Sequence, residues 1–259
     1  MSDLDVKTDA DGITRVTLAR PERHNALDRA LIDRLHNTLA RLDHNTRVLV
    51  LAGRGKSFCA GADVDWMRDS AALSSEENAG DAMSLSALLE TLDRLPCPTI
   101  ARVHGAAIGA GAGLVACCDI AVADEDTRFE FSEVRVGLVP ATISPYVVRA
   151  VGPSTARRWF LFGESFSALE AYHSGLVHDF CSAQDLDHNV NQRLKALLAG
   201  GNAAQRAIKK LVQDVTARPV DTTLQRELAQ RLAAVRAGAE AQEGLAAFQE
   251  RRTPAWRKR

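Results

Sequence analysis

Short apolar runs alternate with helical stretches in the first half of the chain, and this alternation strongly constrains the fold. Continuous apolar residues at 48–52 and 99–103 are typical of strands that are buried on both faces. Alternation at period two predicts a half-buried strand at 13–18, and leucines at helical spacing predict a helix over 26–42. Strands that alternate with helices indicate an α/β fold with parallel strand pairing.

The pattern changes towards the end of the chain. The apolar run 120–123 predicts another strand, and a helix over 78–95 ends before Pro96. Beyond Pro153 the strand signals fade, and only helices are predicted, over 154–162, 168–174, 185–198, 203–215, 222–237 and 239–251. We therefore expect a core over residues 1–195 and a helical region over residues 196–259.

Charge and cysteine usage exclude several classes of protein. The 32 Lys and Arg residues nearly balance the 33 Asp and Glu residues, which argues against nucleic acid or an anionic membrane as the main partner. The longest apolar run, 105–118, is shorter than the ~20 residues that a bilayer requires. The adjacent Cys117 and Cys118 lie in this apolar run, as expected for buried thiols in a reducing compartment. We expect a cytoplasmic protein.

Familiar cofactor and metal signatures fail. A dinucleotide fingerprint that starts at Gly109 would need its third glycine at Leu114. The segment 152–156 lacks the second glycine of a serine-hydrolase nucleophile elbow. No H-E-x-x-H and no C-x-x-C pattern occurs, so the sequence predicts no metal site.

Two segments rich in small residues, 57–64 and 104–113, each follow an apolar strand. Small residues let the backbone approach a ligand closely, and a helix that begins near Ala110 would direct unpaired N–H groups outward. Two such loops side by side would form a two-donor pocket for a carbonyl oxygen that becomes an oxyanion. Close packing of a helix on a strand would use the same residue types.

The order of the short motifs resembles the crotonase superfamily, the enoyl-CoA hydratases and isomerases, over nearly the whole chain. These motifs are Asn25-Ala26-Leu27, Phe58-Cys59-Ala60-Gly61-Ala62-Asp63, His104-Gly105, Gly109-Ala110-Gly111, Cys118-Asp119-Ile120, Phe131-Ser132-Glu133, Gly137-Leu138-Val139-Pro140, Gly175-Leu176-Val177 and Glu243-Gly244-Leu245. The resemblance implies a crotonase-like spiral of ββα units with an acyl-CoA site. It also implies that the helical C-terminal region builds homotrimers, often paired into hexamers.

The same resemblance implies how the substrate is held. The thioester oxygen of an acyl-CoA would accept hydrogen bonds from the backbone N–H groups of Ala62 and Ala110, although the family usually has glycine at the second position. Coenzyme A is then part of the substrate, and no separate cofactor is expected. The residues expected along the coenzyme A arm are Arg23, Ala26, Ala60, Ala62, Asp63 and Val64, with Phe248 and Arg251 reaching a neighbouring subunit's site.

The catalytic carboxylates depart from the family pattern. Hydratases of the family use two glutamates twenty positions apart, and here the later position is Glu133 but the earlier one is Gly113. Glu133 has apolar neighbours, which would raise its pKa and suit a general acid or base. A solvent-exposed carboxylate at the end of a strand is the ordinary alternative.

Three functions remain open. We favour a hydratase, because 113–120 and 132–146 resemble bacterial methylglutaconyl-CoA and isohexenylglutaconyl-CoA hydratases, which act on branched, carboxylated enoyl-CoAs in leucine and acyclic-terpene breakdown. Glu133 would activate water, and the second proton donor would be water, another side chain or the substrate's own carboxylate. The single glutamate also fits a Δ3,Δ2-enoyl-CoA isomerase. A non-catalytic acyl-CoA binder or scaffold would explain the missing acid but not the retained Glu133.

Overall fold

The computed structural model describes residues 3–70 and 72–257. One compact unit comprises the residues up to Leu95 together with Thr99–Asn191, and a second comprises Pro96–Pro98 and the residues from Gln192 onward. The first unit has the α/β fold with parallel pairing that the sequence predicts.

The first unit is built on a six-stranded sheet in the order β1-β2-β3-β4-β6-β9. Only β1 pairs antiparallel, and all the other neighbours are parallel. The strands are β1 Leu4–Thr8, β2 Ile13–Leu18, β3 Val48–Gly53, β4 Thr99–Val103, β6 Ile120–Asp124 and β9 Asp179–Cys181. Their apolar residues form the core, since the side chains at 48–51 are all buried. A smaller sheet joins β5 Ala106–Ile108, β7 Arg128–Glu130 and β8 Ser165–Ser167.

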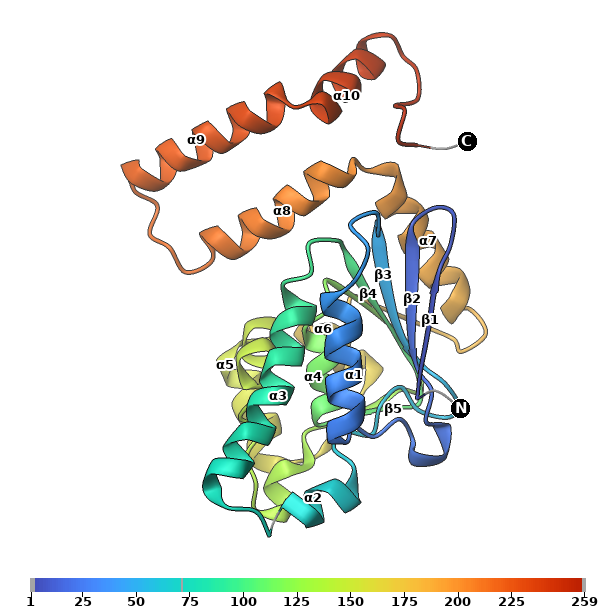
Figure 1. The fold of residues 1–259 in the computed structure, drawn as a ribbon, viewed down its shortest axis with the longest axis vertical. Helices are drawn as coiled ribbons and strands as arrows, with labels where there is room; N and C mark the ends of the chain where they lie inside the picture. Colours follow the sequence, from blue (N-terminus) through green and yellow to red (C-terminus); the bar gives the residue numbers. More distant parts are fainter. Residues whose placement is uncertain (1–2, 71, 258–259) are drawn as a thin grey trace. The chain divides into compact units, whose positions relative to one another are not determined.

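Helices of the first unit pack around these strands, and α1 and α3 lie side by side (Figure 1). The helices are α1 Arg29–Ala40, α2 Val64–Ser70, α3 Ser75–Asp93, α4 Ala110–Ala116, α5 Ser144–Phe162, α6 Ala168–Ser174 and the first part of α7 Leu186–Ala199. Helix α1 begins three residues later than the predicted 26, because Asp28 is extended and its carboxylate accepts a hydrogen bond from the N–H of Leu31.

The second unit is helical in its described part, as the sequence predicts. It holds the end of α7 and α8 Asn202–Val215, α9 Thr222–Ala237 and α10 Ala239–Gln249. The carboxylate of Glu240 in α10 accepts hydrogen bonds from the N–H groups of Ala203 and Ala204 at 3.0 and 2.8 Å. This contact satisfies two of the unpaired N–H groups at the start of α8 and joins that helix to α10.

Two sequence predictions are wrong beyond residue 140. Strands do occur after Pro153, but β8 and β9 have three residues each, too few to show a periodicity, and each is held by pairing with a distant strand. Helix α5 begins at Ser144 rather than at 154, and a bend at Gly152, where φ is +76°, separates its two halves. The sequence pattern predicted only the second half.

Two further findings concern the chain as a whole. All five cysteines are reduced thiols, and Cys117 and Cys118 are buried as expected. In the part of the chain that the structure describes, none of the helices combines the length and the apolar character needed to cross a membrane.

Candidate active site

The first glycine-containing loop, 57–64, runs beside the segment that leads into α1. The N–H of Leu27 donates to the carbonyl of Gly61 at 2.7 Å, and the N–H of Asp63 donates to the carbonyl of Leu27 at 2.8 Å. Both backbone groups of Leu27 are used in this parallel bridge, so the N–H of Ala62 points away from it. That N–H donates no hydrogen bond to any residue that the structure describes.

The second loop meets the first through Cys59. The N–H of Cys59 donates to the carbonyl of Ala106, and the N–H of Ile108 donates to the carbonyl of Cys59, both at 3.0 Å. Ala110 begins α4, so its N–H has no partner within the helix, and among the described residues it donates no hydrogen bond. A Cβ built on Gly61 would lie 3.8 Å from this nitrogen. The structure therefore brings the neighbourhoods of the two expected amide donors together.

The carboxylate of Glu133 lies against the backbone that precedes Ala110. A Cβ built on Gly109 would lie 2.9 Å from Glu133 Oε1, and the φ angle of Gly109 is +50°. Glu133 Oε2 is buried and has no hydrogen-bond partner among the described residues. Burial raises the pKa of Glu133, and the negative charge of Glu130 raises it further, against a backbone hydrogen bond that lowers it. A carboxyl group in this environment can carry a proton between reacting atoms.

An aromatic cluster holds the segment that carries Glu133. This segment is a short 3₁₀ helix, Ser132–Val136, and Phe131 directly before it is fully buried. The Phe131 ring packs edge-on against Phe160 at 5.1 Å between centroids and lies 5.7 Å from the ring of Phe166. This packing fixes the backbone directly before Glu133. Of the apolar residues that follow it, Val134 and Val136 are 40% and 66% exposed.

The position of the missing carboxylate is filled. A Cβ built on Gly113 would lie 2.3 Å from Cγ2 and 2.9 Å from Cβ of Ile143, which is buried. No side chain fits at residue 113 unless Ile143 moves. The apolar side chain of Ile143 therefore occupies the space beside residue 113, where the resemblance led us to expect a glutamate, and Glu133 lies beside the start of α4.

The residues expected along the coenzyme A arm fall into two groups. Arg23, Ala26, Ala60 and Val64 lie with Ala62 and Asp63 where residues 23–28 and 60–64 run together, and the N–H of Ala60 donates to the carbonyl of His24. Phe248 and Arg251 belong to the second unit, so their part in this site stays a prediction. Phe248 is 84% exposed.

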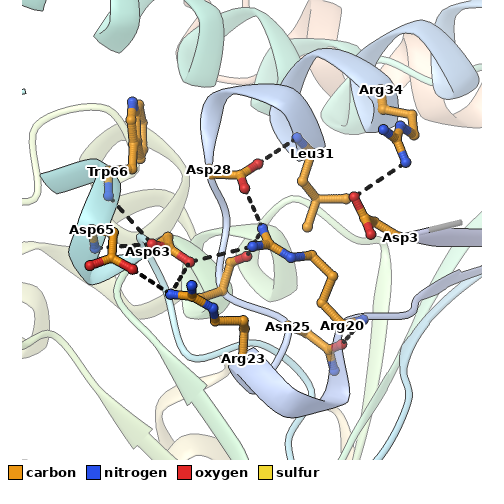
Figure 2. A network of polar contacts seen from close by, with 11 residues as sticks. Asp3, Arg20, Arg23, Asn25, Asp28, Leu31, Arg34, Asp63, Asp65 and Trp66 are labelled. Atoms are coloured by element: carbon orange, nitrogen blue, oxygen red, sulfur yellow. Dashed lines mark hydrogen bonds and ion pairs between the residues drawn. The ribbon is translucent and has the colours of Figure 1, made fainter. Parts of the chain in front are cut away.

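Asp63 has a different environment from the others, and it contacts a residue that the sequence analysis missed. Its buried carboxylate accepts from the N–H of Asp65 at 3.0 Å and lies 3.6 Å from Arg23 Nη1 and 3.5 Å from Arg20 Nη2 (Figure 2). No sequence signal identifies Arg20. Its side chain contacts Ala26 and Asp28 nearby in the chain, but it reaches the site through Asp63, which is 43 positions away.

Other chemistry has little support at this site. Burial raises the pKa of the Cys59 thiol to about 12, so Cys59 supplies no thiolate near neutral pH. The described residues contain no group of three or more His, Cys, Asp and Glu side chains that could hold a metal ion.

The chain matches a known protein family over nearly its whole length. The profile of the family described as Enoyl-CoA hydratase/isomerase matches residues 8–259. The chain belongs to this family. This match confirms the resemblance to the crotonase superfamily and the expectation that the chain is an enzyme. The expected ββα fold is confirmed as well, because solved structures of enoyl-CoA hydratases share the fold of this chain.

Individual members of the family match over nearly the full chain. The 2,3-dehydroadipyl-CoA hydratase of Escherichia coli is 35% identical over 92% of this chain and 92% of its own length. The solved structure of an enoyl-CoA hydratase from Shewanella pealeana is 38% identical, with a TM-score of 0.94 over 98% of this chain and 96% of that one. An enoyl-CoA hydratase from Mycobacterium smegmatis is 34% identical, with a TM-score of 0.94 over the whole of both chains.

Proposed function

We propose that this chain is an enoyl-CoA hydratase that adds water across the double bond of an α,β-unsaturated acyl-CoA. The observation that carries the proposal is the position of the desolvated Glu133 carboxylate beside Gly109, the residue that directly precedes Ala110. The hydratase names of the relatives that match over nearly the full chain support it.

In the proposed reaction Glu133 takes a proton from water while the water oxygen bonds to C3 of the substrate. The electrons of the double bond move to the thioester oxygen, and the N–H groups of Ala62 and Ala110 stabilise the resulting enolate oxyanion. The proton held by Glu133 then returns to C2, which restores the thioester carbonyl and gives a 3-hydroxyacyl-CoA. In this reaction Glu133 itself replaces the separate second proton donor that the sequence left open, because the same proton is taken and returned.

We further propose a branched, carboxylated substrate of the methylglutaconyl type, as in leucine breakdown. The resemblance of 113–120 and 132–146 to hydratases of such substrates supports this class. The E. coli relative supports the carboxylated part of this class, because 2,3-dehydroadipyl-CoA is an unbranched enoyl thioester with a free carboxylate at its other end. Coenzyme A would be part of the substrate, with no other cofactor, no nucleic acid and no membrane as partner. Five thiols suit a cytoplasmic location.

The isomerase alternative rests on Ile143, whose side chain fills the space where a second catalytic glutamate at residue 113 would lie. Glu133 would then act alone. A Δ3,Δ2-isomerase needs one carboxylate, which takes a proton from C2 of the β,γ-unsaturated thioester and returns it at C4. A non-catalytic acyl-CoA binder is less well supported, since a binder needs no desolvated proton carrier.

Incubation in heavy-oxygen water tests these alternatives. Crotonyl-CoA, methylglutaconyl-CoA and a β,γ-unsaturated acyl-CoA are each incubated with the protein, and the products are analysed by mass spectrometry. We expect one ¹⁸O atom in a 3-hydroxyacyl product, with faster turnover of methylglutaconyl-CoA. Migration of the double bond without label would instead assign an isomerase, and binding without turnover of any substrate would assign a binder.

A further inference from the structure

Arg20 joins the segment before α1 to the first loop of the candidate site (Figure 2). Its Nη1 donates to Asp28 Oδ2 at 2.6 Å and to the carbonyl of Ala26 at 3.2 Å, and its Nη2 lies 3.5 Å from Asp63 Oδ2. The side chain of Arg20 is 12% exposed and that of Asp63 is 5% exposed. Solvent and salt therefore screen this ion pair much less than a surface pair.

Each of the two carboxylates that Arg20 contacts also accepts a hydrogen bond from a backbone N–H at the start of a helix. Asp28 Oδ1 accepts from the N–H of Leu31 at 2.8 Å at the start of α1. Asp63 Oδ1 accepts from the N–H of Asp65 at 3.0 Å at the start of α2. Arg20 therefore fixes the starts of two helices relative to each other.

The backbone N–H of Ala62 lies within this arrangement. Leu27 bonds to the carbonyl of Gly61 and to the N–H of Asp63, so it holds the residues on both sides of Ala62. The direction of the Ala62 N–H is set by how the segment around Leu27 lies against the segment around Asp63. Arg20 contacts both segments, at Ala26 and Asp28 on one side and at Asp63 on the other.

We propose that Arg20 is a positioning residue that orients the Ala62 N–H towards the thioester oxygen. This inference rests on the proposed function, in which that N–H stabilises the oxyanion. A guanidinium suits the task, since its planar fork reaches two carboxylates and a carbonyl at once, whereas a lysine ammonium has no such fork. Arg23 also contacts Asp63, but its side chain is 49% exposed and pairs mainly with Asp65 at 2.6 Å.

The test measures how strongly the site polarises a bound thioester. Crotonyl-CoA labelled with ¹³C at the carbonyl is bound to the wild type, R20M, R20K and D63N, and its carbonyl stretch is recorded by infrared difference spectroscopy beside kcat and KM. R34M is the matched control, because Arg34 lies in α1, is half-exposed and pairs with Asp3 at 3.3 Å away from the loop.

We expect the carbonyl stretch to shift to lower frequency in the wild type and in R34M alike. In R20M the shift becomes smaller and kcat falls on the order of 10- to 100-fold, while KM changes less, because the lost orientation acts on the transition state. R20K is expected to lie between the two.

Two results would overturn this inference and leave the proposed function standing. One is an R20M protein with lowered thermal stability but an unchanged carbonyl shift and kcat, which would leave Arg20 a purely structural role. If R20M does not fold, D63N decides, because it keeps an acceptor oxygen for α2 and loses the charge that faces Arg20 and, at 3.6 Å, Arg23. An unchanged shift and kcat in D63N would be the other contrary result. A wild type without any shift or turnover would overturn the proposed function itself, and this inference with it.

Discussion

Glu133 combines a desolvated carboxylate with a position beside Gly109, directly before Ala110, and both properties have consequences at the scale of one residue. Glu133→Gln keeps the shape of the side chain but cannot accept a proton. We expect kcat to fall by about 10²- to 10⁴-fold, the usual contribution of a positioned acid or base. Binding of a 3-hydroxyacyl-CoA, measured by calorimetry, should persist. Unchanged turnover would exclude Glu133 as the proton carrier.

The same substitution also predicts a pH-dependent change in stability. Burial, followed by the charge of Glu130, raises the pKa of Glu133 in the folded state above its unfolded value. Such a group favours folding fully below the unfolded pKa, and this contribution is lost as pH rises through the folded pKa. Glu133→Gln should therefore raise Tm at neutral pH and lose this advantage in acid. Glu76→Gln, at an exposed position in α3, is the control and should change Tm little at either pH.

Gly113 and Ile143 form a second residue-scale feature, because they share one volume. Gly113→Ala should destabilise the fold by about 1–3 kcal/mol through overpacking, more than the ~1 kcal/mol that alanine gains in a helix. Ile143→Ala alone should cost about 2–5 kcal/mol as a cavity. In the double variant the new methyl group occupies part of that cavity, so urea unfolding should show a favourable coupling of about 0.5–3 kcal/mol. If the free-energy changes of the two single variants simply add, residues 113 and 143 do not share one volume.

A site residue could be predicted from the sequence when it lies in a short motif, but not when it acts through a contact with a residue far away in the chain. Ala62, Ala110 and Glu133 each lie in a short motif, so a resemblance was enough to nominate them. Arg20 and Ile143 could not be predicted as site residues. Arg20 acts through Asp63, 43 positions away, and Ile143 acts through Gly113, 30 positions away. Sequence spacing does not show such contacts until the strands are paired.

At the scale of elements, length separates what could be predicted from what could not. The strands of the main sheet over 13–18, 48–53 and 99–103 have five or six residues, enough to show an apolar run or a period of two. The three-residue strands of the small sheet carry no such pattern, and their pairing with each other holds them in place. That small sheet carries both β5, which leads into Ala110, and β7, which leads into Glu133.

The turn between β5 and α4 gives a prediction at this scale. At Gly109, φ is +50° and ψ is −115°, a conformation that an L-residue adopts only at a cost of about 1–3 kcal/mol, and a Cβ would press on Glu133 Oε1. Gly109→Ala should therefore lower kcat as well as stability. Gly137→Ala is the matched control, because Gly137 also has a positive φ, +73°, but a Cβ there meets no atom within 4 Å. Equal losses of kcat in the two variants would show that the contact with Glu133 is irrelevant.

At the scale of the whole molecule, the helical second unit would serve assembly, as membership of the crotonase family leads us to propose. Helix α8 supports this role, since Ile208 and Val212 are four residues apart and lie on one face, yet they are 55% and 57% exposed. Burying such a pair in a contact between subunits would contribute several kcal/mol per interface.

The prediction for assembly is a mass of three or six times the 28.0 kDa of one chain in light scattering. Replacing both Ile208 and Val212 by glutamate places like charges in the proposed contact, so the mass should fall towards that of a single chain. Lys210→Glu is the control, because Lys210 lies between the two on a different face of α8 and is already exposed and charged. Circular dichroism should show that the helices persist in all three proteins. If the wild type has the mass of one chain, residues 196–259 have no assembly role, and Phe248 and Arg251 cannot contribute to a neighbouring subunit's site.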